Sequence, residues 1–334
     1  MKRYHVYGLG AALVDTEIEV TDTDLAAMRV EKGVMTLVDE ARQHELLQHL
    51  SGHLVHSRRA SGGSAANSII GVAQFGGSTY YSCRVADDEN GRFYLEDMQA
   101  AGVDCFQDRS NQQGITGKCL VMITPDAERT MNTFLGASAT LSVGDLEPDA
   151  ILASEYLYLE GYLVTSPDGR AAAIRAREIA EQNGVKTALS FSDPGIVAHF
   201  KAGLQEMIGQ RVDLVFCNEH EAMSWVGADN LDAAIDGLKQ VARQFAITRG
   251  SAGAVLFDGE NTHHVDAFPV RAIDTNGAGD MFAGAFLYGI THGLDFPAAG
   301  KLASLSAATV VSDYGPRLTR AQQHEILQQL QLTR

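Results

Sequence analysis

The chain has few cysteines, few basic residues and no long apolar run, and each shortage excludes a class of protein. Its four cysteines are widely spaced and form no CxxC pair, which gives no support to a zinc ribbon or a dithiol redox site. No stretch of about 18 apolar residues occurs, so nothing predicts a transmembrane helix. The first residues, MKRYHVYGLGAALVD, have the pattern of a strand and a turn rather than of a secretion signal. We therefore expect a soluble, cytoplasmic protein.

Basic residues are scarce relative to acidic ones. The chain has 26 Lys and Arg against 42 Asp and Glu, a formal net charge of −16 at pH 7, and its Lys and Arg form no block. Such a surface repels polyanions, so neither nucleic acid nor an anionic membrane is an expected partner. A small anionic ligand remains compatible, because main-chain N–H groups at a helix N-terminus hold phosphate even in an acidic protein.

The pattern of the second half predicts an α/β domain. No repeat, low-complexity segment or Pro/Ser-rich linker interrupts the 334 residues, and their apolar content can supply one large core. From about residue 150, predicted strands alternate with predicted helices: strands 156–164, 185–192, 212–218 and 245–250, and helices 168–182, 197–208 and 219–245, the last broken at Gly227. A hairpin from AGAVLFDG and THHVDAFPV should follow, then two closing helices, one opening at Gly279 and one across 297–311. This alternation implies a mostly parallel sheet covered by helices on both faces.

The first half contains four shorter alternating segments, at 16–20, 33–39, 117–125 and 129–135. We expect them to pair as a small extra sheet. Because this sheet would be built from two separate stretches of the chain, we expect it to form a flap that excludes water from a cleft.

The stretch DTNGAGDMFAGAF, residues 274–286, places an acid at the start of an apolar helix. Gly277 and Gly279 allow backbone angles that other residues avoid, and the first-turn N–H groups of a helix point outward without an acceptor. We interpret this turn as an anion hole for phosphate, with Asp280 reaching an attacking hydroxyl. The alternative is that Asp280 only interacts with the helix dipole, a contribution of about 0.3–1 kcal/mol.

Three further segments combine polar residues with strand or helix ends. SGGSAANSIIGVAQFGG, residues 61–77, is a Gly-rich turn feeding a helix, and its amides with Asn67 suit a polyhydroxyl ligand, although tight helix packing is the simpler explanation. NEHE, residues 218–221, follows a buried-looking strand, where its Asn and Glu suit either Mg²⁺ or ordinary helix capping. TRGSAG, residues 248–253, is another strand-to-glycine turn of the kind that nucleotide phosphates approach.

Other motifs are incomplete. GLGAAL has Leu13 in place of the third glycine of a dinucleotide-binding turn, which disfavours a nicotinamide oxidoreductase. GITGKC has Gln112 and Cys119 where a P-loop needs Gly and Ser or Thr. The histidines at 49, 53 and 56 have the spacing of metal ligands on a helix, but they lie in a polar segment that we expect to be a solvent-exposed helix face.

Taken together and in this order, GGSAAN, NEHE and DTNGAGD resemble the motifs of the ribokinase-like (PfkB) carbohydrate and nucleoside kinases, over nearly the whole chain. The resemblance implies one ribokinase-like domain, 1–334: a three-layer α/β/α sandwich with a mostly parallel central sheet and a small β lid from about 12–40 and 106–137. It implies transfer of the ATP γ-phosphate to a primary alcohol, with Mg²⁺. GGSAANSI, LEGYLVTSP, SFSDP, VDLVFCNEHEA and SDYGPRL are most similar to the adenosine kinase type, so adenosine is the expected acceptor, phosphorylated to AMP in purine salvage.

The resemblance also implies roles for individual residues. By motif position, Asp280 is the catalytic base, the anion hole is formed by Gly277, Ala278 and Gly279, and Arg129 in the lid contacts phosphate. Sugar hydroxyls are held by Asp15, Gly62, Gly63 and Asn67, and the apolar walls for a nucleobase are Met35, Phe134 and Tyr162. Mg²⁺ is organised by Asn218 and Glu221 (Glu221 through water), and ATP lies near Asn218, Thr248, Gly250, Gly253, Asn276, Gly277 and Gly279. An effect of K⁺ or Na⁺ at the 274–276 and 311–317 loops is a further implication.

One position departs from the adenosine kinase pattern. Such kinases commonly read GxGNxxxD near the start, whereas GLGAALVD has Ala11 in place of Asn. The missing amide leaves open a different nucleoside or a sugar as acceptor, as in fructokinases and ribokinases. A catalytically silent relative acting as a binding module is a second alternative, although Asp280, Asn67 and Glu221 are all retained. The sequence leaves the choice between monomer and homodimer open.

Overall fold

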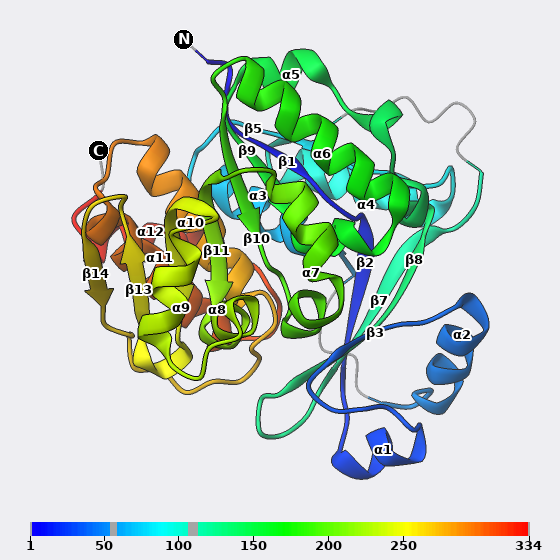
Figure 1. The fold of residues 1–334 in the computed structure, drawn as a ribbon. Helices are drawn as coiled ribbons and strands as arrows, with labels where there is room; N and C mark the ends of the chain where they lie inside the picture. The colour runs from blue at the N-terminus through cyan, green and yellow to red at the C-terminus, as the bar shows by residue number, and fades with distance from the viewer. Residues whose placement is uncertain (1, 54–58, 106–112, 333–334) are drawn as a thin grey trace.

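The computed structural model describes residues 2–53, 59–105 and 113–332, and these residues form two β-sheets (Figure 1). The larger sheet has the strand order β14-β13-β12-β11-β10-β9-β1-β5-β6. Its strands are β1 (Tyr4–Leu9), β5 (Thr79–Ser82), β6 (Val103–Cys105), β9 (Ser154–Glu160), β10 (Lys186–Ser190), β11 (Val212–Asn218), β12 (Ala242–Thr248), β13 (Ala254–Phe257) and β14 (Thr262–Val265). All neighbours from β6 to β12 pair in parallel, and β13 and β14 add an antiparallel hairpin at one edge.

Helices cover both faces of this sheet, because its strands are apolar on both sides. One face packs against α3 (Ser64–Gln74), α4 (Glu89–Ala100), α10 (Ala278–Thr291), α11 (Phe296–Val311) and α12 (Arg320–Gln329). The other packs against α5 (Pro148–Leu152), α6 (Pro167–Gln182), α7 (Pro194–Ile208), α8 (Glu219–Val226) and α9 (Leu231–Leu238). The predicted three-layer α/β/α sandwich is confirmed.

The smaller sheet extends away from the larger one together with two helices (Figure 1). Its order is β3-β8-β7-β2-β4, from β2 (Leu13–Glu19), β3 (Met35–Leu37), β4 (Ala60–Gly62), β7 (Thr116–Ile123) and β8 (Arg129–Gly136). Helices α1 (Asp22–Ala27) and α2 (Glu40–His49) lie in the same part of the molecule. The four predicted segments therefore do pair, and β4 joins them from outside the expected ranges. Residues 106–112 of the expected lid range lie outside the described residues.

Some element boundaries were predicted wrongly, and one helix was missed. The strand predicted at 156–164 ends at Glu160, where the chain turns into the short 3₁₀ segment Gly161–Thr165; a Cβ on Gly161 would lie 2.8 Å from the carbonyl oxygen of Ser190. The helix predicted to 245 gives way to a strand that begins at Ala242, paired with β11. A third closing helix, α12, was missed, although Thr319 and Gln322 form the capping box that marks its start.

Candidate active site

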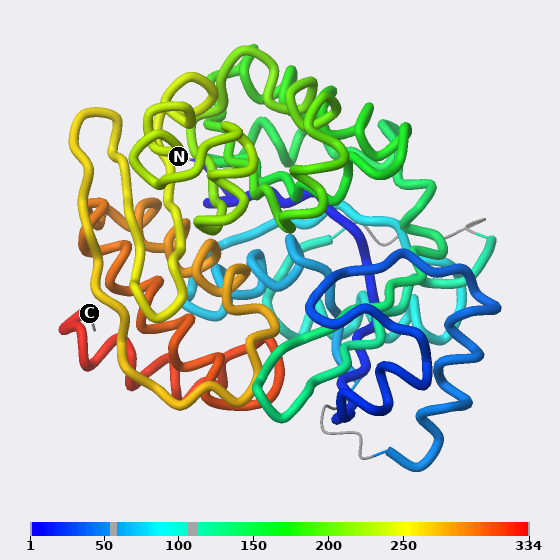
Figure 2. Tube along the Cα trace, turned by 60° about the horizontal axis from the view of Figure 1, so that its bottom comes forward, coloured from blue at the N-terminus to red at the C-terminus, as the bar shows by residue number. Residues whose placement is uncertain are grey.

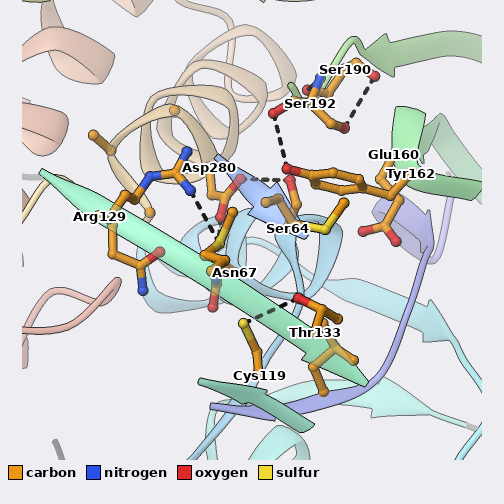
Figure 3. Close-up of a pocket in the computed structure, with 18 of the residues that line it drawn as sticks. Ser64, Asn67, Cys119, Arg129, Thr133, Glu160, Tyr162, Ser190, Ser192 and Asp280 are labelled. Atoms are coloured by element: carbon orange, nitrogen blue, oxygen red, sulfur yellow. Dashed lines mark hydrogen bonds between the residues drawn. The ribbon is translucent and has the colours of Figure 1, made fainter. Parts of the chain in front are cut away.

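A cavity of about 350 Å³ lies between the two sheets (Figure 3). Its floor includes the carboxyl ends of the central strands of the large sheet, at Glu160, Ser190, Asn218 and Thr248. Its other wall is the inner face of β2, β3, β7 and β8. In an open α/β sheet this edge is where ligands bind, and the small sheet encloses it.

The first turn of α10 opens onto this cavity through Gly277, Ala278 and Gly279. Gly277 has the left-handed angles φ 73° and ψ 2°, and a Cβ there would lie 2.3 Å from Cβ of Pro316, so this turn requires glycine. A Cβ on Gly279 would meet nothing within 4 Å. The first-turn N–H groups have no intrahelical acceptor, so the turn can bind an anion.

Asp280 lies where α10 meets α3. Its Oδ1 accepts a hydrogen bond from Ser64 Oγ at 2.6 Å, and its Oδ2 accepts one from Asn67 Nδ2 at 3.1 Å (Figure 3). Burial raises the pKa of Asp280, and the bonds from Ser64 and Asn67 oppose that rise. These bonds fix the orientation of the carboxylate, which lines the cavity. Tight helix packing, the alternative explanation for the Gly- and Ala-rich segment 61–77, also holds, since Gly284 of α10 lies directly against the backbone of Ser68 in α3.

The predicted hydroxyl-binding residues lie at or close to the cavity that Asp280 lines. Asp15, Gly63 and Asn67 line the cavity, whereas Gly62 lies behind Asp15, where a Cβ would fall 2.0 Å from the Asp15 carboxylate. Gly63 has φ 102°, and a Cβ on it would be 2.4 Å from the carbonyl oxygen of Ala11. Asn67 Oδ1 is buried and has no hydrogen-bond partner among the described residues.

Strand β8 alternates between the cavity and the opposite face of the small sheet. Arg129 lines the cavity and is the only positively charged residue among the described ones that do. Its guanidinium extends toward Asp280 in Figure 3 and lies 3.1 Å from Sδ of Met131. Met35 and Tyr162 line the cavity as predicted, but Phe134 does not: an even-numbered residue of β8, it borders a separate groove of the small sheet.

Asn218 and Glu221 form a capping box at the start of α8. Glu221 accepts from the N and Nδ2 atoms of Asn218 at 2.9 and 2.8 Å, and Asn218 Oδ1 accepts from the N atom of Glu221. The capping explanation is thus correct, and both residues also line the cavity. Burial raises the pKa of Glu221 to about 7. Because both carboxylate oxygens are already engaged, Glu221 suits contact with a metal through water better than direct ligation.

The residues predicted for ATP are not all at the cavity. Thr248, Asn276, Gly277 and Gly279 line it, but Gly250 and Gly253 do not. Glycine is required at 253 by packing, since its φ is 84° and a Cβ would lie 2.0 Å from the carbonyl oxygen of Val265; its contact with ATP stays a prediction.

Sequence reasoning missed several polar residues of the cavity, among them Glu160 and Ser64. Glu160 ends β9, and its carboxylate accepts from the N atoms of Ala11 at 2.7 Å and Ala65 at 2.8 Å. Burial raises the pKa of Glu160 to about 7. An acid that closes the apolar run YLYL at a sheet edge was the available signal. Ala11, which replaces the expected Asn, is therefore held through its backbone.

A contact joins the small sheet to the loop before α10. Figure 2 shows the turn between β7 and β8 beside that loop, and Thr275 Oγ1 donates to the carbonyl oxygen of Ala127 at 3.1 Å. Small-sheet residues therefore also border the cavity next to the loop that precedes α10.

The buried carboxyls of the cavity make stability depend on pH. Burial raises the pKa of Asp15 to about 8, with the charge of Glu17 as the next cause and Arg317 opposing it, and Glu160 and Glu221 reach about 7. The folded state therefore binds more protons than the unfolded state above the unfolded pKa near 4. The contribution of these three carboxyls to stability is greatest below that pKa. It is lost as pH rises through their folded pKa values, by at most about 1.4 kcal/mol per pH unit for each carboxyl that is protonated only in the folded state.

We expect Tm, measured by calorimetry, to fall between pH 6 and 8, and Asp15→Asn to reduce that slope. Asp126→Asn is the matched control: hydrogen bonds from Lys32 and Thr124 lower the pKa of Asp126 to about 2, outside this window. Equal slopes in both variants would contradict the prediction.

The histidine segment has no metal-like arrangement in the described residues. His49 is exposed, His53 lies 3.5 Å from Asp24, and residue 56 is outside the described ranges. Within residues 2–53, 59–105 and 113–332, no group of three or more His, Cys, Asp or Glu could hold a metal ion. In the same ranges no helix has the length and apolarity needed to span a bilayer.

Comparison with known proteins supports the resemblance that the sequence motifs indicate, independently of the cavity geometry. The family model described as pfkB family carbohydrate kinase matches residues 34–322. The adenosine kinase of Saccharomyces cerevisiae is 29% identical over 333 residues, covering 92% of this chain and 95% of that one. The structure of a probable sugar kinase from Rhizobium etli superposes with a TM-score of 0.93 at 34% identity and covers 100% of both chains. That of adenosine kinase from Sinorhizobium meliloti gives 0.92 at 33%, covering 98% and 99%.

Proposed function

Since this chain belongs to the pfkB family of carbohydrate kinases and is a kinase, we propose that it phosphorylates the primary alcohol of a nucleoside, adenosine first among the candidates, with Mg²⁺-bound ATP as donor. In this proposal the whole chain acts as one kinase domain, and the small sheet is the lid of its active site. The observation that carries the reaction is the placement of Asp280, oriented by Ser64 and Asn67, beside the open first turn of α10.

Asp280 acts as the general base of an in-line displacement. It accepts the proton of the acceptor hydroxyl as that oxygen attacks the γ-phosphorus and ADP leaves. The amides of the Gly277–Gly279 turn and the guanidinium of Arg129 stabilise the charge on the transferring phosphoryl group. A positioned base supplies about 10²–10⁴-fold in rate, and one lost oxyanion donor costs about 2.7–4 kcal/mol. The anion hole and Arg129 together therefore exceed the contribution of Asp280.

The residues present suit a magnesium ion that arrives with ATP. Glu221 and Asn218 line the cavity but bond to each other, so they would hold Mg²⁺ through water, while the phosphates supply its direct ligands. When bound, the ion neutralises phosphate charge. An effect of K⁺ or Na⁺ at the 274–276 and 311–317 loops stays a prediction.

The wall of the cavity supports a nucleoside over a free sugar. Side chains of the small sheet form a mostly apolar surface there, from Leu13, Met35, Leu37, Val121, Met131 and Leu135. Such a surface suits the flat base of a nucleoside, while Asp15 and Asn67 remain for ribose hydroxyls. The adenosine kinases among the relatives support the same acceptor.

A sugar kinase is the second candidate. It is favoured by Ala11, which presents no side-chain amide to the cavity, and by the similarity to the probable sugar kinase from Rhizobium etli.

The deciding experiment is a coupled ADP-release screen of nucleosides and monosaccharides with ATP and Mg²⁺. We expect adenosine to give the highest kcat/KM, by at least about tenfold over fructose and ribose, which corresponds to about 1.4 kcal/mol. Fructose or ribose as the best acceptor would favour the sugar kinase. ATP-dependent phosphorylation of none of them would count against the proposal and favour a silent binding module.

A further inference from the structure

The segment Tyr314–Arg317, between α11 and α12, contacts both halves of the active site, and we call it the bridge segment. On the phosphate side, Gly315 N donates to Asp274 Oδ2 at 3.0 Å, and Asp274 Oδ1 accepts from Asn276 N at 2.8 Å. Pro316 packs directly against Gly277, the left-handed residue of the anion hole. The bridge segment thus fixes the loop that precedes α10.

On the acceptor side, Arg317 holds the short strand β4. Its Nη1 donates to Asp97 Oδ2 at 2.8 Å, and its Nη2 donates to Ser61 Oγ at 2.7 Å and to the Ser61 carbonyl oxygen. Asp97 Oδ2 also accepts from the N and Oγ atoms of Ser61 at 3.0 and 2.7 Å. Every polar atom of Ser61, a fully buried residue, is therefore bonded to the Arg317–Asp97 pair. Only the planar fork of an arginine reaches two partners in this way.

Strand β4 leads directly into the loop that faces the acceptor. It has three residues and, among the described residues, pairs only with β2, so its own ladder fixes it weakly. Its last residue, Gly62, contacts Asp15; Gly63, which follows, contacts Ala11, and Ser64 orients Asp280. A shift of β4 would move these contacts. Tyr314 extends the same connection to the small sheet, because its hydroxyl donates to Glu19 Oε1 at the end of β2.

From these contacts we infer that Arg317 is a positioning residue: through Ser61 and Pro316 the bridge segment sets the acceptor loop and the anion hole at the spacing that phosphoryl transfer needs. The catalytic consequence rests on the proposed function, whereas the structural coupling does not. A misplacement of about 1 Å at a reacting centre costs about 10²-fold in rate, so a residue without substrate contact can have a large effect on kcat.

The first arm of the test uses the full chain without substrate. Hydrogen–deuterium exchange is compared for wild type, Arg317→Met and the matched control Arg177→Met, which removes another largely buried arginine whose ion pair with Glu181 lies on α6. We expect Arg317→Met to raise exchange at both 60–66 and 274–280, and Arg177→Met to raise it at neither. Exchange raised only at 314–320 would overturn the coupling.

The second arm measures catalysis with adenosine and ATP. Arg317→Met is expected to lower kcat by about 10–100-fold, to leave the KM for ATP within about threefold, and to raise the ratio of ADP released to AMP formed, because a misplaced acceptor lets water compete. Arg177→Met should match wild type in all three. Arg317→Lys, which keeps the charge but loses the fork, should show the same change, and it replaces Arg317→Met if that variant does not fold.

Failure of the positioning role can be distinguished from failure of the proposed function. An active wild type whose Arg317 variants keep kcat within twofold and a ratio of one would overturn the positioning role. A wild type that phosphorylates none of the screened alcohols would count against the proposed function, and the exchange arm would still decide the coupling.

Discussion

Asp280→Asn should lower kcat by about 10²–10⁴-fold, since the amide cannot accept the proton of the attacking hydroxyl. The substitution keeps the size and shape of the side chain, and Ser64 Oγ can still donate to its oxygen. The bond from Asn67 Nδ2 would face an amide nitrogen instead of a carboxylate oxygen, so Asn67 is expected to reorient. Steady-state kinetics with adenosine and ATP measures the effect.

The KM values distinguish this role from a merely structural one. Because Asp280 acts in the transition state, kcat and kcat/KM should fall together while the KM for ATP stays within about threefold. Since burial raises the pKa of Asp280, the carboxylate form is disfavoured in the free protein, and Asn in its place should not lower Tm. A KM increase with intact kcat would contradict the assignment of Asp280 as base.

Gly277→Ala is the second substitution with a large expected effect. An alanine there must take a left-handed conformation, which costs about 1–2 kcal/mol, and its Cβ would lie 2.3 Å from Cβ of Pro316. Either the turn or the bridge segment must move, so the anion hole loses its geometry. Loss of one such donor lowers kcat by about 10²–10³-fold.

Gly279→Ala provides the matched control for stability. Gly279 lies two residues away in the same turn and lacks both constraints, because its φ is not positive and a Cβ on it meets nothing within 4 Å. Gly277→Ala is expected to lower Tm by several degrees in differential scanning calorimetry, whereas Gly279→Ala should leave Tm unchanged or slightly raised. Equal Tm values for the two variants would mean that the turn tolerates a side chain at position 277.

Local patterns in the sequence were sufficient for most elements of the large sheet. Apolar strands such as VDLVFCN and the helix at DTNGAGDMFAGAF were predicted because their period and end signals are contained in a few neighbouring residues. The same locality explains the errors. Ala242 has a helical local pattern but pairs with Val212 as a strand residue, and the apolar run that begins in β9 continues past Glu160 as a 3₁₀ turn.

Residue type and short spacing are enough to predict helices on both faces of a parallel sheet, the glycine turn before Asp280 and the net acidic charge. Which side chains face the cavity depends on how distant segments pack. Phe134 is turned away by the pleat of β8, Glu160 reaches Ala11 and Ala65 from a distant strand, and Arg317 meets Ser61 from 256 residues away. Such contacts are between residues far apart in the chain, and no local period encodes them.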